Sequence, residues 1–410
     1  MKRYVIIGGG VAAVGCIEGI RSVDPAGEIT LISAEDRPVY CRPLISYYLE
    51  GKTDPERISY RDGDFYHRMG CTVLYGRQAI RIRPDERQVG LDDGTSLSYD
   101  ALCVATGSSP FVPPMAGLET VPCRHTFMTM EDALALEQSV NDRSRVLIVG
   151  AGLIGLKCAE GLCRRVAGIT VCDLADRVLS SILDSECAAM MQKHLEQNGI
   201  RFLLGNSVGQ FDGNTARMKN GEEVAFDVLV LAVGVRANTA LVREIGGAVG
   251  RGITVDSRMR TSLPNIYAAG DCTESEDVSS GQTRVMAILP NAVLQGRTAG
   301  VNMAGGDAVF DTGMPLNAIG FFGLHALTAG SYEGECYEEK TDRSLKRLFI
   351  RDGLLKGFIL IGCEERAGIY TAMIREKTPL SGIDLDLMKK TATNAAFSAE
   401  TRRKKFGGVV

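Results

Sequence analysis

Short apolar runs, each followed by a glycine-rich turn, occur at two places in the chain. Residues 4–7 (Tyr-Val-Ile-Ile) precede Gly-Gly-Gly-Val-Ala-Ala at 8–13, and residues 146–149 (Val-Leu-Ile-Val) precede Gly-Ala-Gly-Leu-Ile-Gly at 150–155. A run of this length suits a buried strand, and the glycines after it suit a tight turn into a helix. The pattern therefore predicts a strand, a turn and a helix at each place.

Each predicted helix leads to a second apolar run that ends near an acidic residue. Glu35 follows residues 29–32, and Asp173 follows residues 169–172. In such a unit the glycines let the backbone approach a pyrophosphate, the helix N-terminus offers it free N–H groups, and the carboxylate accepts from a ribose hydroxyl. A single copy of this motif also suits a glycine turn in an unrelated α/β fold, but two complete copies indicate two bound dinucleotides.

Both units continue through a hairpin into a closing strand. Asp93-Gly94 and Asn220-Gly221 are residue pairs typical of tight hairpin turns. The apolar strands that follow end in Ala-Thr-Gly at 105–107 and in Ala-Val-Gly at 232–234. The repeat predicts an α/β protein with two Rossmann-like dinucleotide-binding domains.

Composition narrows the class of protein. The chain has 410 residues, which suits two or three domains, and 45% of them are hydrophobic. The net charge of -4 gives no general attraction to nucleic acid. No apolar stretch approaches the roughly 20 residues of a membrane-spanning helix. Met1-Lys2-Arg3 runs directly into the first predicted strand and leaves no room for a signal peptide, so we expect a cytoplasmic protein.

The 12 cysteines do not form a recognisable ligand set. No two of them have the Cys-x2-Cys spacing of a zinc ribbon or an iron–sulfur cluster, so we predict no metal site. Most of the cysteines lie in apolar contexts and are expected to be small buried residues.

The order of these motifs resembles that of one known superfamily. The two glycine turns, the closing Ala-Thr-Gly and Ala-Val-Gly, and Ile-Tyr-Ala-Ala-Gly-Asp at 266–271 are similar to those of the FAD-dependent pyridine nucleotide-disulfide oxidoreductases. Within that superfamily, four segments resemble the NADH:rubredoxin reductases and the flavin half of assimilatory nitrite reductases: residues 40–46, 290–297, 315–318 and 322–324.

The resemblance implies a domain organisation. Residues 1–112 and 248–306 would bind FAD, and residues 113–247 would form an inserted NAD-binding domain. Residues 307–392 would form a small C-terminal α/β interface domain, and residues 393–410 a basic tail.

The resemblance also implies a role for each motif residue. The FAD pyrophosphate would contact Gly8, Gly10 and Ala13, and the adenosine ribose would contact Glu35. Arg42 and Pro43 would lie beside the adenosine and pyrophosphate, and Thr106 and Gly107 beside the phosphates. Asp271 would contact the ribityl chain. NAD(H) would contact Gly150, Gly152, Gly155, Asp173 and Gly234.

Asp173 favours NADH over NADPH. A carboxylate about 4 Å from a 2′-phosphate charge costs up to ~4 kcal/mol at an effective dielectric of ~20. Arg177, which follows in the sequence, would soften this preference if its guanidinium faced the phosphate.

Two candidate chemical residues depart from the family pattern. Ferredoxin-reductase relatives pair a lysine and a glutamate near the flavin, where this chain has Tyr47 and Lys157. The Lys157 ammonium would stabilise the reduced flavin, unless the lysine pairs with Glu160 or is solvated on its helix. Cys41 lies near the position of the single redox cysteine of NADH peroxidases, and the adjacent Arg42 would lower its pKa, but the surrounding motif differs.

These expectations describe an FAD-dependent NADH:acceptor oxidoreductase. Hydride would pass from NADH to FAD, and electrons would leave to an iron–sulfur protein such as rubredoxin. Three alternatives stay open: an NAD-reducing flavoprotein subunit of a larger metal or iron–sulfur enzyme, a single-cysteine NADH oxidase, peroxidase or disulfide reductase, and a flavin-bearing NADH sensor.

Overall fold

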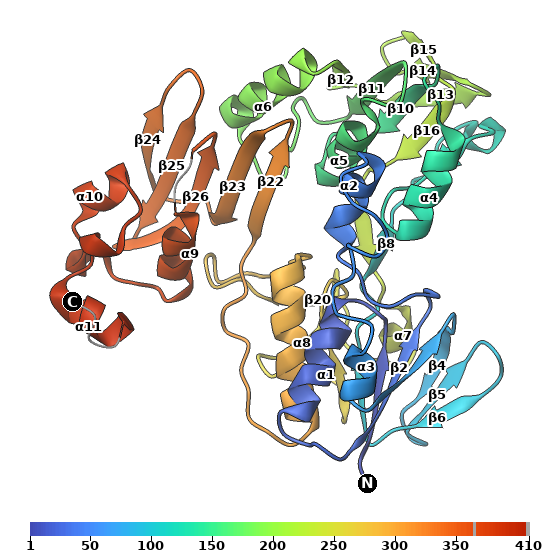
Figure 1. Ribbon diagram of the computed structural model, residues 1–410, viewed down its shortest axis with the longest axis vertical. Coiled ribbons are helices and arrows are strands. Elements are labelled where there is room, and N and C mark those ends of the chain that lie inside the picture. The colour runs from blue at the N-terminus through green and yellow to red at the C-terminus, as the bar shows by residue number, and fades with distance from the viewer. Residues whose placement is uncertain (364–365, 407–410) are drawn as a thin grey trace.

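The computed structural model describes residues 1–363 and 366–406 and contains three domains (Figure 1). We call them the N-terminal, central and C-terminal domains. Among the helices of these described residues, none is long and apolar enough to cross a membrane.

The N-terminal domain is built on a parallel five-stranded sheet in the order β19-β7-β1-β2-β3. Its strands are β1 (Arg3–Ile7), β2 (Glu28–Ser33), β3 (Cys71–Tyr75), β7 (Ala101–Val104) and β19 (Ile266–Ala268). Helices α1 (Val11–Arg21), α3 (Phe65–Arg68) and α8 (Leu289–Met303) pack in one hydrophobic cluster with β1 and β2. The last strand and α8 come from a part of the chain that follows the whole central domain.

The central domain repeats this architecture. Its parallel sheet has the order β12-β11-β10-β16-β9. The strands are β9 (Arg124–His125), β10 (Arg145–Val149), β11 (Gly168–Asp173), β12 (Ile200–Leu204) and β16 (Val228–Leu231), with helices α4 (Met130–Ser139), α5 (Leu153–Leu162) and α6 (Ser185–Gln197). In the central strand of each sheet, β1 and β10, the first residue is exposed and the next four are buried, which is why each strand appears in the sequence as a continuous apolar run.

Each sheet carries the hairpin that the turn residues predicted. In the N-terminal domain β4 (Ala79–Arg83), β5 (Gln88–Leu91) and β6 (Ser96–Ser98) form an antiparallel meander, and in the central domain β13 (Val208–Asp212), β14 (Thr215–Met218) and β15 (Glu223–Ala225) form another. The chain passes between the two domains through the antiparallel pair β8 (Ser108–Pro110) and β17 (Val235–Ala237). The smaller elements of the N-terminal domain are α7 (Ala240–Arg243), β18 (Ile253–Thr254), β20 (Thr273–Glu276) and β21 (Thr283–Arg284).

The C-terminal domain has an antiparallel five-stranded sheet in the order β22-β23-β26-β25-β24. Its strands are β22 (Leu316–Phe321), β23 (Leu324–Gly330), β24 (Glu335–Lys340), β25 (Leu345–Arg351) and β26 (Leu354–Ile361), and its helices are α9 (Ala367–Arg375), α10 (Leu385–Lys390) and α11 (Ala399–Phe406). One face of the sheet packs against α9 and α10. The predicted basic tail is therefore helical over α11, and residues 407–410 lie outside the described residues.

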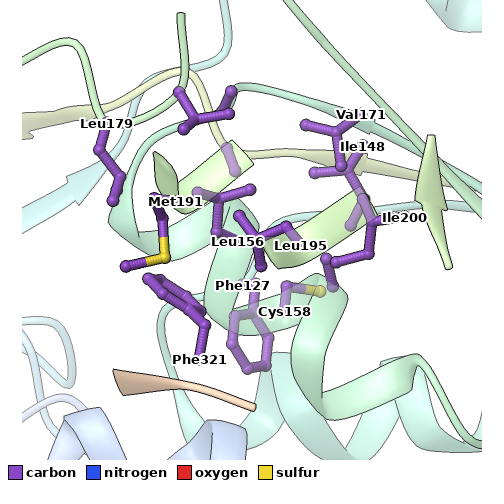
Figure 2. Close-up of a cluster of buried hydrophobic side chains, with 14 of the residues drawn as sticks. Phe127, Ile148, Leu156, Cys158, Val171, Leu179, Met191, Leu195, Ile200 and Phe321 are labelled. Atoms are coloured by element: carbon purple, nitrogen blue, oxygen red, sulfur yellow. The ribbon is translucent and has the colours of Figure 1, made fainter. Parts of the chain in front are cut away.

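The other face of the C-terminal sheet shares a hydrophobic core with the central domain. Phe321 of β22 lies among Phe127, Leu156 and Met191 of the central domain (Figure 2). Helix α2 (Ile45–Leu49), which belongs to the N-terminal half of the sequence, packs into the same core. The core of the central domain thus includes side chains from both of its neighbours.

Helices α1 and α8 lie side by side in direct backbone contact (Figure 1). A Cβ placed on Gly15 or Gly19 of α1 would lie less than 3.0 Å from backbone atoms of α8. A Cβ on Gly296 or Gly300 of α8 would lie as close to backbone atoms of α1. Only glycine permits this approach, which fixes the returning segment against the first helix.

We expect Gly296→Val to destabilise the N-terminal domain by about 3 kcal/mol or more, because the new side chain overlaps the Ala12 carbonyl and the packed helices cannot separate cheaply. Thermal denaturation of the purified apoprotein measures this loss. Gly368→Ala in α9 is the matched control, since its Cβ would meet nothing within 4 Å. Equal stability of the two variants would contradict the proposed role of the helix contact.

Candidate functional site

The two glycine turns have the same geometry in the two domains. Gly8 and Gly150 have φ values of 114° and 120°, in the region that favours glycine. A Cβ on Gly8 would clash with the Ala105 carbonyl, and one on Gly150 with the Ala232 carbonyl. Each turn therefore presses against the end of the closing strand of its own sheet.

The space in front of each turn is open. A Cβ placed on Gly10 or Gly152 would meet no protein atom within 4 Å. These two glycines are also the N-caps of α1 and α5, and neither helix has a side-chain cap hydrogen bond. Each turn thus leaves an open space at a helix N-terminus, which we call a cradle and which a side chain at Gly10 or Gly152 would partly occupy. The free N–H groups and the dipole of the helix make this space suitable for a phosphate. Beyond it, Ala13 is fully buried, whereas a Cβ on Gly155 would collide with the Gly150 carbonyl.

The acidic residues after β2 and β11 are held in different ways. Glu35 forms an ion pair with Arg42 and accepts a hydrogen bond from the Tyr40 hydroxyl at 2.8 Å. Asp173 accepts instead from backbone N–H groups, at 2.7 Å from Ala151 in the glycine turn and at 2.8 Å from Ala175. The Asp173 carboxylate is thus bonded directly to its glycine turn, whereas the Glu35 carboxylate is held by side chains of the segment that follows β2.

The Ala-Thr-Gly segment is fixed by a residue that the motif did not include. Thr106 donates through Oγ1 to the Asn238 carbonyl at 2.8 Å, and the Asn238 amide donates to the Thr106 carbonyl at 2.9 Å. Gly107 and Gly234 have positive φ values of 63° and 114°, and a Cβ on either would meet nothing within 4 Å. The two segments that connect the domains, which follow β7 and β16, are therefore hydrogen-bonded to each other.

Asp271 lies at the end of β19, close to the N-terminal glycine turn. Gly270 donates its N–H to the Gln295 side chain of α8 at 2.8 Å, and a Cβ on Gly270 would lie 3.0 Å from the Cβ of Ala12. Burial raises the pKa of the Asp271 carboxyl, and the nearby Arg42 guanidinium partly offsets this shift. Pro43 is exposed in a short 3-10 turn, Arg42–Leu44, beside this site. The structure brings together Arg42 and Asp271, which are far apart in the sequence.

Lys157 lies where the three domains meet. Its ammonium is 4.8 Å from the centre of the Tyr47 ring in α2 and 5.3 Å from that of Phe321 in β22. It forms an ion pair with Glu160 and donates to the Gly320 carbonyl at 3.1 Å. The expected pair with Glu160 is present, and the paired ammonium lies at the junction of the domains.

A family model for pyridine nucleotide-disulphide oxidoreductases matches residues 2–296. The chain belongs to this family. It is an FAD-dependent NAD(P)H oxidoreductase, and the resemblance seen in its motifs is confirmed.

Two relatives and one solved structure illustrate the range of the family. The chain is 33% identical over 392 residues to the NADH-dependent phenylglyoxylate dehydrogenase subunit epsilon of Aromatoleum evansii, covering 92% of this chain and 93% of that protein. It is 30% identical over 403 residues to the assimilatory nitrate reductase electron transfer subunit of Bacillus subtilis (strain 168), covering 95% of this chain but 50% of that protein. A crystal structure of the covalent putidaredoxin reductase-putidaredoxin complex shares the fold, with a TM-score of 0.87, 24% identity and 95% of each chain covered.

The open cradles at Gly10 and Gly152 fit the pyrophosphates of FAD and of a nicotinamide dinucleotide, respectively. FAD supplies the chemistry of the family, because it accepts two electrons from a nicotinamide ring and passes them on. The residues of this chain that would hold the cofactors are the backbone N–H groups at the two turns for phosphates and, as the motif implies, Glu35 and Asp173 for ribose hydroxyls, with the Lys157 ammonium at the junction of the domains.

Cys41 does not have the environment of a redox cysteine. Burial raises the pKa of its thiol, and the N–H of Leu44 offsets this only in part. Arg42 pairs with Glu35 and does not lower this pKa. The expectation that Arg42 activates the Cys41 thiol is therefore wrong, because the guanidinium has a carboxylate partner. All twelve cysteines are free thiols, including Cys158 and Cys163 on and just after α5.

Sequence reasoning missed the residues that hold the motifs in place. Tyr40, Asn238 and Gln295 bond to Glu35, Thr106 and Gly270, respectively. Their only sequence signal is that each is a polar residue beside or within a motif. Asn238 bonds across a separation of 132 residues, so no local pattern identifies its partner.

Gly10→Ala and Gly152→Ala separate cofactor binding from folding. Each new methyl group would meet no protein atom within 4 Å, so we expect the stability of the apoprotein to fall by no more than about 1 kcal/mol, the ordinary cost of alanine at an N-cap. Gly10→Ala should weaken FAD binding ~10-fold or more, and Gly152→Ala should raise the KM for the nicotinamide cofactor by a similar factor. Flavin titration and steady-state kinetics measure these effects. Retention of normal affinity in both variants would show that phosphates do not enter the cradles.

Cys41→Ser should leave the rate of flavin reduction by NADH within about twofold of wild type, because this thiol is not activated. Stopped-flow absorbance of the flavin provides the measurement. Loss of all turnover in this variant would instead restore the redox-cysteine alternative.

Proposed function

We propose that this flavoprotein passes electrons between NADH and an iron–sulfur protein. The observation that supports this proposal most directly is the pair of open cradles, one in each of two matching domains. Helix α5, which begins at the second cradle, carries Lys157 to the C-terminal domain, where the ammonium donates to the Gly320 carbonyl. This arrangement binds two dinucleotides and orients them, and it includes no activated thiol at Cys41.

The preference for NADH rests on the surroundings of Asp173. Its carboxylate is fixed beside the glycine turn by the N–H groups of Ala151 and Ala175. Arg177, the one cation expected to soften the preference, pairs with Asp176 at 2.9 Å and reaches the Leu183 carbonyl at 3.4 Å. Leu174, next to Asp173, is 67% exposed and offers a phosphate no partner. A 2′-phosphate would therefore meet a fixed negative charge.

We expect wild-type kcat/KM to be at least ~10-fold higher with NADH than with NADPH, and Asp173→Asn to narrow this ratio by removing the repulsion. Glu196→Gln, at an exposed position of α6, is the control and should keep the wild-type ratio. A wild-type preference for NADPH would contradict the proposed role of Asp173.

The iron–sulfur partner is supported by the names of similar proteins. The structural neighbours include a putidaredoxin reductase bound to putidaredoxin and an NADH:rubredoxin oxidoreductase from Clostridium acetobutylicum. A second candidate is favoured by a relative of which 93% is covered, and which is named as a subunit of an NADH-dependent dehydrogenase. In that case the chain is a fixed subunit of a larger enzyme and reduces NAD with electrons from the complex.

The C-terminal domain and α11 are the proposed contact surface. Helix α11 carries Arg402 and Arg403, and it begins after Ala396 and Phe397, which are buried in the core of the domain. Removal of the chain from Ala399 onward therefore tests the basic helix without cutting into this core.

We expect the chain lacking residues 399–410 to reduce an iron–sulfur carrier such as rubredoxin several-fold more slowly at low salt while reducing an artificial dye at the wild-type rate. Carrier reduction by the full chain should slow as the Debye length falls to about 8 Å at physiological ionic strength. Co-purification with iron–sulfur subunits would identify the fixed-subunit candidate. Oxidation of NADH by oxygen or peroxide alone, as fast as with any protein acceptor, would overturn both candidates.

A further inference from the structure

Glu160 is a buried carboxylate with two different partners. It lies one turn after Lys157 on α5, and its side chain is 5% exposed. One carboxylate oxygen pairs with the Lys157 ammonium, and the other accepts a hydrogen bond from the backbone N–H of Phe322 at 2.7 Å. A carboxylate in such a place is stable only with partners of this kind, because the loss of either leaves a buried charge unsatisfied.

Phe322 belongs to the tight turn between β22 and β23. Its φ of 48° is left-handed, which is uncommon for a residue with a side chain, and Gly323 follows with φ of 87°. The ring of His194 in α6 lies 3.0 Å from the Phe321 carbonyl through Nε2. Lys157 itself donates to the Gly320 carbonyl. The tip of this hairpin is therefore held at several atoms by the central domain.

The Lys157 side chain is largely enclosed by neighbouring groups. Tyr47 from α2 presents its ring to the ammonium at 4.8 Å, and the Phe321 ring lies at 5.3 Å. The lysine side chain is 18% exposed. The ammonium therefore has one strong anionic partner, Glu160, and that partner is anchored to the hairpin of another domain.

We propose that Glu160 is a positioning residue: it holds the Lys157 ammonium at the junction of the domains and ties that position to the β22–β23 turn. This inference rests on the proposed function in one respect: a bound flavin must lie close enough to Lys157 for the charge of the ammonium to affect its potential. The charge of Glu160 then sets how much of the lysine's positive charge is left to stabilise the reduced flavin. The same carboxylate links the site to the C-terminal domain.

The two charges should act on the flavin in opposite directions. Glu160→Gln keeps the size of the side chain and an oxygen acceptor for Phe322, but it leaves the ammonium less neutralised, so the flavin midpoint potential should rise. Lys157→Met leaves the carboxylate uncompensated, so the potential should fall. We expect each single variant to change the equilibrium constant for reduction by about threefold or more. The double variant should return close to wild type, and Lys157→Arg should keep the wild-type potential.

A second measurement uses the apoprotein and needs no flavin. Hydrogen exchange followed by mass spectrometry reports the protection of peptides that cover the β22–β23 turn. Glu160→Leu removes the acceptor, so the Phe322 amide should exchange at least ~10-fold faster. The control is Glu137→Gln, which disturbs another contact between domains, with Tyr48 of α2, and a pair within the central domain, with Arg165. It should change neither the turn nor the potential.

The two results separate the possible failures. Shifts of potential in the same direction for Glu160→Gln and Lys157→Met, or no shift in either, would overturn the inference. Unchanged exchange at the turn in Glu160→Leu would also overturn it. Absence of flavin reduction by NADH in the wild-type holoenzyme would overturn the proposed function instead, and it would leave the exchange result of the apoprotein unaffected.

Discussion

The backbone contact between α1 and α8 is the constraint on which the N-terminal domain depends. The glycines of the two helices meet the backbone of the opposite helix, so the segment that returns from the central domain can pack in only one way. This packing brings Gln295 to Gly270 and places Asp271 beside the glycine turn at the start of α1. The site is completed by residues far from the motif because two helices without intervening side chains fix the return of the chain.

The central domain depends on its neighbours in a different way. Its hydrophobic core includes Ile45 and Leu49 from α2 and Phe321 from β22 (Figure 2). Burying each such side chain contributes about 1.5–3 kcal/mol. Arg347 of β25 is only 14% exposed and pairs with Asp184, the N-cap of α6, and with Glu186 in its first turn. The three domains are thus joined by packing near the site and by ion pairs away from it.

These joints place charged groups where a redox centre would use them. Arg42 neutralises Glu35 and acts on Asp271, and Glu160 neutralises Lys157. Buried or half-buried ion pairs of this kind add little net stability, because removing two charges from water offsets much of their attraction. Their value lies in fixing the position of a charge, which is what transfer between two aligned cofactors requires.

The sequence by itself determined the two strand, turn and helix units, their hairpins and the family. These features depend on residues close together in the chain: glycines that follow an apolar run, Asp-Gly and Asn-Gly turns, and an acid after the next strand. The tertiary structure alone decided the partners of the charged side chains. Glu160 meets Phe322 across 162 residues, because the packing of distant segments selects among partners that the local sequence leaves equally available. Arg42 pairs with the nearby Glu35 instead of activating Cys41, and this choice between two local partners is visible only in the folded chain. The strand β9 was also missed, since its short pairing with β16 depends on the neighbouring sheet and not on a pattern of its own.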